Sequence, residues 1–228
     1  MKRFSPIILI LIGILVIYWS GIYQYISFDT LKAQHTALKA FITEHPISTP
    51  LIFMLSYTVL TALSVPGGIF LSLLGGYLFP QPLSTLYVVI AATVGATLLF
   101  LAAKTAIGDL LKKKAGPFLK KMEQGFQHNA ASYLLFLRFV PLFPFWIVNL
   151  ASALFGVPLR TFVWTTFVGI IPGALVFTLV GGGLEKVFEG QKEFSLSAIF
   201  NPELKIALVL LGLLALVPIL FKKRKRDL

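Results

Sequence analysis

Arg138 is the residue of this sequence that most clearly suggests binding chemistry. It lies in the apolar stretch Leu137–Gly156, LRFVPLFPFWIVNLASALFG, with two prolines and Asn149. A cation inside a bilayer costs about 2.5–3.5 kcal/mol on insertion scales, so Arg138 needs a partner. Because a planar guanidinium donates two parallel hydrogen bonds to phosphate, that partner can be a ligand phosphate. Backbone carbonyls, or a position near the interface where the charge reaches water, are the alternatives.

Prolines and glycines interrupt two apolar segments. Broken helices expose free N–H groups and the positive end of the helix dipole, which attract anions. The prolines also fit a role in shaping a turn, and Asn149 fits a hydrogen bond between helices equally well. The candidate substrate-binding residues are Arg138, Asn149, Pro141, Pro144, Pro66, Gly67 and Gly68.

The apolar segments lack the residues that enzymes use. Residues 45–103 contain no Asp, Glu, Lys or Arg, and between Glu123 and Glu185 the charged side chains are Arg138 and Arg160. The chain has no cysteine, and its three histidines lie outside the most apolar runs. An aspartate dyad, a Ser–His pair or a metal centre is therefore not expected, and neither is an enzyme or a cofactor.

Composition indicates an integral membrane protein. Of 228 residues, 57% are apolar and 13% charged, whereas soluble domains have about 25% charged residues. Residues 4–28 carry no charge, and about 20 apolar residues suffice to cross a bilayer. The net charge of +11 comes from clusters beside apolar runs, which is typical of membrane proteins, so nucleic acid is not an expected partner.

The expected fold is an all-α membrane protein with a central core at 48–184. The N-terminal helix 1–28 is interpreted as a retained span, with a signal peptide as the alternative. Residues 29–47 form an interfacial amphipathic helix or a short connector. The remaining expected elements are transmembrane helices 84–107, 159–183 and 205–221, an external loop at 185–204, and a basic tail at 222–228.

Segments 48–80 and 130–157 each contain two short apolar pieces around a break. A helix of 13 residues reaches only about 20 Å, too little to cross a bilayer. Each segment is therefore predicted to be a re-entrant hairpin, with one kinked span plus a loop as the alternative. Gly67, Gly68, Gly75 and Gly76 are expected to let the two hairpins approach closely.

Orientation and sequence similarity within the chain agree with this topology. Basic residues cluster at the N-terminus, near 112–121 and in the tail, which places these three regions in the cytoplasm. The hairpins must then enter from opposite faces. LFPQPLST (78–85) and LFGVPLRT (154–161) share five of eight residues at an offset of 76. The sequence therefore predicts an inverted repeat of hairpin plus span, an arrangement common in transporters.

The segments FLRFVPLFPFWIVNLASALFGV and VPGGIFLSLLGGYLFP resemble the DedA superfamily, in particular its VTT-domain or SNARE-associated Golgi protein branch. The resemblance covers about residues 50–183. It implies two facing re-entrant helices that help lipids change leaflet: polyprenyl phosphates in bacterial DedA proteins and phospholipids in eukaryotic relatives. Arg138 matches the first arginine of the motif R-F-x-P-x-x-R, but Pro144 replaces the second. The family's intramembrane acids are also missing, so proton coupling through them is not expected.

The expected function is therefore a flippase or scramblase in a bacterial cytoplasmic membrane, with both termini cytoplasmic. Its partner would be a phosphate-bearing lipid, either a polyprenyl phosphate or a phospholipid, and a homo-oligomer is compatible with the sequence. A small-solute or ion secondary transporter and a non-transporting scaffold are the alternatives.

Overall fold

The structure is a computed structural model that describes residues 35–65, 67–106, 117–139 and 143–189, with residues 202, 205–210 and 213. Within these ranges the chain is all-helical and contains no strand, which confirms the all-α part of the expected fold class. The predicted N-terminal span, the basic tail, most of the external loop, and Pro66 and Pro141 lie outside it. The helices are α4 (His35–Glu44), α5 (Ser48–Ala62), α6 (Gly68–Leu78), α7 (Leu83–Ala106), α9 (Pro117–Phe139), α10 (Phe145–Leu154) and α11 (Leu159–Glu189).

Among the described residues, two helices are long and apolar enough to cross a membrane. These stretches are Leu83–Thr105 of α7 and Leu159–Gly183 of α11, with 23 and 25 residues. Helix α11 continues to Glu189, so the loop expected from residue 185 does not begin there. Gly181 and Gly182 lie inside this helix. Both face α6, where their lack of a side chain allows close packing.

The shorter helices form two pairs around breaks, as the apolar pieces predicted. Helix α5 ends in a tight turn in which Ser64 has φ 58°, and Gly67, with φ 153°, precedes α6. Helix α9 is broken at Asn129, whose side-chain oxygen accepts a hydrogen bond from the backbone N–H of Ser132 at 3.1 Å. This cap starts a second helical piece at residue 130, which a break then separates from α10.

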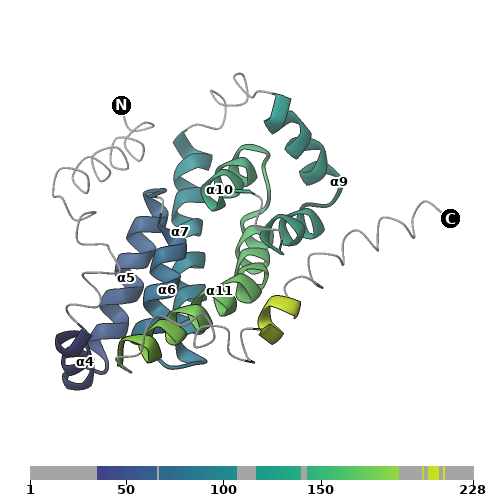
Figure 1. Cartoon of the computed structure of the whole chain (residues 1–228). Coiled ribbons are helices and arrows are strands. Elements are labelled where there is room, and N and C mark those ends of the chain that lie inside the picture. The colour runs from purple at the N-terminus through teal and green to yellow at the C-terminus, as the bar shows by residue number, and fades with distance from the viewer. Residues whose placement is uncertain are drawn as a thin grey trace.

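Helix α7 lies in the middle of the molecule and contacts α5, α6, α10 and α11 (Figure 1). One cluster of buried apolar side chains surrounds Phe100 and Phe162, whose rings stack 4.4 Å apart. A second cluster surrounds Phe53 and Val88. Phe145, the first residue of α10, packs against both clusters, so it lies where the two halves of the core meet.

Helix α6 packs directly on the backbone of α11. A Cβ atom on Gly76 would overlap the carbonyl oxygen of Thr178, and one on Gly181 would overlap the carbonyl oxygen of Leu73. The expectation that Gly76 brings the two hairpins together is therefore wrong. Its neighbour is α11, because α11 carries its own glycine on the facing surface. The side chain of Gln81 adds a hydrogen bond to the Thr178 hydroxyl at 2.7 Å.

This packing predicts that Gly76→Ala lowers the free energy of unfolding by about 1–3 kcal/mol, because the added methyl must displace the α11 backbone. Gly173→Ala is the matched control, since a Cβ there meets no atom within 4 Å. Thermal unfolding in detergent measures both variants. Equal midpoints for the two would show that α6 and α11 do not pack this closely.

Candidate functional site

The guanidinium of Arg138 is held between α9, α10 and α11. Arg138 lies at the end of α9, and its Nη2 donates hydrogen bonds to Asn149 Oδ1 at 2.7 Å and to Thr166 Oγ1 at 2.9 Å. Asn149 and Thr166 are fully buried. The partners that Arg138 finds are thus side-chain oxygens, and not the backbone carbonyls considered from the sequence.

One face of α11 supports this cation. Phe162, Thr166 and Gly169 follow one another at helical spacings of four and three residues, so they share a face. A Cβ atom on Gly169 would lie 2.6 Å from the Cβ of Arg138, so the glycine leaves room for the arginine side chain. One face of α11 therefore provides three things to the Arg138 side chain: the ring of Phe162, the hydroxyl of Thr166 and the space left by Gly169.

Two aromatic rings flank the guanidinium. Its central carbon lies 4.4 Å from the centroid of the Phe145 ring and 5.6 Å from that of Phe162. Cation–π attraction is strongest where water is absent, and it offsets part of the cost of burying this charge. The rings do not satisfy the N–H groups of the guanidinium, however.

Several donors at this site have no partner. Arg138 Nε, Arg138 Nη1 and Asn149 Nδ2 are all buried, and none of them makes a hydrogen bond with the described residues. Buried polar groups are almost always satisfied, so a group of three free donors around one cation calls for an explanation. The sequence offers no acidic residue in the apolar segments of α9, α10 or α11. The arrangement fits an anion with several acceptor oxygens, such as phosphate.

Helix α10 adds its dipole to this environment. It begins at Phe145, after Pro144, and no side chain caps its first turn. The N–H groups of Ile147 and Val148 both point back to the carbonyl oxygen of Pro144. The positive end of α10 thus lies one turn before Asn149, and it favours a negative group near the guanidinium.

Of the other predicted residues, Gly67 and Gly68 do not join this cluster, and Pro66 and Pro141 lie outside the described residues. The carbonyl oxygen of Gly68 accepts hydrogen bonds from the hydroxyls of Tyr57 at 3.2 Å and Ser72 at 2.7 Å, within the α5–α6 pair. Gly67 adopts a positive φ, where a side chain would be strained, so it serves the turn. The structure therefore brings together Arg138 and Asn149 and builds a separate polar group around Gly68.

Sequence reasoning did not identify Thr166, Phe145, Phe162 and Gly169 as parts of the site. Thr166 lies 28 residues from Arg138, and no local pattern joins them. The available signal was the common face of Phe162, Thr166 and Gly169 on a long apolar helix. A hydroxyl and a glycine on such a face indicate contact with a polar side chain from another helix.

The contacts predict that Asn149→Leu lowers the free energy of unfolding by about 1.5–3 kcal/mol, because a buried cation loses an acceptor. Ser152→Ala, on the same helix, is the control. The Ser152 hydroxyl is also buried but bonds the Val148 carbonyl within its own helix, so its loss is expected to cost less. Unfolding midpoints in detergent report both changes, and an unchanged midpoint for Asn149→Leu would contradict the assignment.

Comparisons with known proteins identify the family. Residues 65–183 match the VTT domain, which is more than half of the chain. Transmembrane protein 41B from Mus musculus is 29% identical over 203 residues, covering 87% of this chain and 67% of that protein. The Transmembrane protein 41 homolog from Dictyostelium discoideum is 30% identical and covers 87% of this chain and 58% of its own length. No solved structure matches the chain.

The VTT match contains both helix breaks, Arg138 and all of its described partners. The resemblance stated from the sequence motifs is thereby confirmed. The chain belongs to the VTT-domain family of membrane proteins, the SNARE-associated Golgi protein branch of the DedA superfamily.

Proposed function

We propose that this membrane protein moves a phosphate-bearing lipid between leaflets, as a flippase or scramblase, and that Arg138 binds the headgroup phosphate. The observation that carries the proposal is the buried guanidinium, which has free donors and no acidic partner in the described part of the chain. A headgroup phosphate supplies the missing acceptors. It would receive hydrogen bonds from Arg138 Nε and Nη1 and from Asn149 Nδ2, while the acyl or prenyl tails stay in the surrounding lipid.

The proposal includes two re-entrant helix pairs related by an inverted repeat. Helices α6 and α10 end at residues 78 and 154, and helices α7 and α11 begin at residues 83 and 159. Both differences are 76 residues (154 − 78 and 159 − 83), which equals the offset of the repeated octapeptide. Two units at this constant offset, each with a broken helix pair before a long helix, support this interpretation.

Helix length supports the re-entrant path. Helices α6 and α10 have 11 and 10 residues, or about 15 Å at 1.5 Å per residue, half of a bilayer core. Non-helical backbone is tolerated at membrane depth where protein or a polar cavity surrounds it. Each pair would enter and leave on one face, with both chain termini in the cytoplasm, and the two breaks would lie near the membrane midplane.

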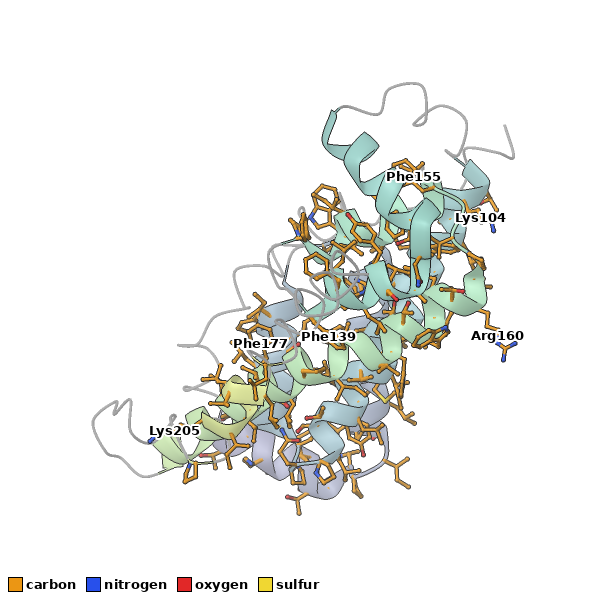
Figure 2. The ribbon with its side chains drawn as sticks, turned by 90° about the vertical axis from the view of Figure 1, so that its right-hand side faces the viewer. Lys104, Phe139, Phe155, Arg160, Phe177 and Lys205 are labelled. Carbon is orange, nitrogen blue, oxygen red and sulfur yellow. The ribbon has the colours of Figure 1, made fainter. Side chains whose placement is uncertain are left out.

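The first functional prediction concerns the charge itself. Arg138→Ala is expected to lower the rate of lipid movement at least about tenfold, because each charge-assisted hydrogen bond contributes on the order of 1.5–3 kcal/mol. Arg138→Lys keeps the charge but loses the planar fork, so part of the rate should remain. The assay follows fluorescent phospholipid and polyprenyl phosphate in proteoliposomes. Arg160→Ala is the control, because Arg160 is exposed at the start of α11 and points away from the helices (Figure 2).

A full rate in Arg138→Ala would rule out this role for the arginine. If the reconstituted protein moved a small solute and no lipid, a secondary transporter would replace the proposed lipid transporter. If it moved neither, the proposed function would be wrong.

The second functional prediction separates stability from transport. Asn149→Asp places a carboxylate 2.7 Å from the guanidinium, at the present position of the amide oxygen. The new ion pair would satisfy Arg138, so the unfolding midpoint should stay at or above that of the unaltered protein. Because the positive charge is then neutralised, lipid movement should fall on the order of tenfold. Unimpaired transport by a well-folded Asn149→Asp variant would count against phosphate binding.

A further inference from the structure

Different atoms of Arg138 differ in their exposure to the surroundings of the protein. The residue as a whole is only half-buried, yet its Nε and Nη1 are buried. The exposed part of Arg138 is therefore not Nε or Nη1. The ring nearest to the guanidinium is that of Phe145, at 4.4 Å.

The two flanking rings differ in how firmly they are held. Phe162 is 0% exposed, sits within α11 and stacks on Phe100 at a centroid distance of 4.4 Å with an interplanar angle of 22°. Phe145 is half-buried and is the first residue of α10, directly after Pro144, which is exposed. The Phe162 ring is enclosed by the core. Phe145 also packs against both clusters, but it is half-buried and stands at a helix end, so its ring is the less confined of the two.

We propose that Phe145 is a movable aromatic cover over the anion site, and that Phe162 is its fixed wall. In the closed arrangement, the Phe145 ring stabilises the guanidinium through its π face and blocks access to Nε and Nη1. When the ring turns away, a phosphate group replaces it and supplies the acceptors that the ring lacks. This inference rests on the proposed function for the nature of the ligand. The cover itself is argued from the position of the Phe145 ring over the guanidinium.

Because a phosphate and the Phe145 ring compete for the same cation, the cover sets how often the site is open. An exposed cation–π pair is weak, and a desolvated one is worth about 2 kcal/mol or more. Replacing the ring by leucine keeps an apolar side chain, but this side chain is smaller and has no π face to hold it over the cation. Phe145→Leu should therefore open the site without removing any residue that holds the guanidinium through a hydrogen bond.

Chemical modification of the arginines tests the cover directly. Phenylglyoxal reacts with accessible guanidinium groups, and peptide mass spectrometry of the full chain in detergent gives the ratio of adduct at Arg138 to adduct at Arg160. Exposed Arg160 is the internal reference. Phe145→Leu is expected to raise this ratio roughly tenfold. Phe162→Leu should leave it within about twofold, because Phe145 still covers the site.

Ligand protection identifies what enters the open site. In Phe145→Leu, dihexanoylphosphatidylglycerol or inorganic phosphate should slow the modification of Arg138 and leave that of Arg160 unchanged. Protection by the lipid alone assigns the site to a lipid-borne phosphate, and protection by both assigns it to the phosphate group itself. If neither protects Arg138, the site does not take this anion and the proposal is overturned.

The modification ratio also separates this inference from the proposed function. An unchanged ratio in Phe145→Leu, or an equal rise in Phe162→Leu, overturns the cover even if Arg138→Ala still loses lipid movement. A raised ratio in Phe145→Leu alone supports the cover even if no variant moves lipid. Phe145→Ala, which removes more of the side chain, should raise the ratio further, while the unfolding midpoints of all variants exclude general loosening.

Discussion

The burial of one guanidinium without a carboxylate is the constraint on which the rest of this structure depends. Removing a cation from water costs several kcal/mol, and Arg138 recovers only part of this through Asn149, Thr166 and two aromatic rings. Three helices must meet at one point to provide these contacts. The unsatisfied donors that remain are the physical basis for expecting an anionic ligand.

Helix α11, which contributes to this point, is also held by close packing at its other end. Helix α11 carries the face that receives Arg138 and, further along, the turn that meets α6 through Gly76 and Gly181. Direct contact between two backbones leaves little freedom for either helix to rotate. The glycine contact therefore restrains one end of α11, and the other end of the same helix presents Thr166 and Phe162 to the arginine.

This chain departs from the DedA motif beside the arginine site. Where the motif of the DedA superfamily has its second arginine, this chain has Pro144, and the next residue is Phe145. The ring of Phe145 lies on the remaining cation and packs against both apolar clusters. The site thus combines a single positive charge with an aromatic neighbour that belongs to both halves of the core. A change at this ring would affect the site and the contact between the halves together.

The sequence by itself determined the all-helical class and the breaks near residues 66 and 141. It also showed that the apolar segments contain no acidic residue that could pair with Arg138. These features depend on local composition: apolar runs, helix-breaking residues and the absence of carboxylates are visible without a fold. Only the tertiary structure decided that Gly76 meets α11 instead of the second helix pair, and that Thr166, Phe145 and Phe162 complete the arginine site. Such contacts join residues far apart in the chain, and they depend on how each helix is rotated about its axis. Helical periodicity gives the residues on a face, but the shape of the neighbouring helices decides what that face touches.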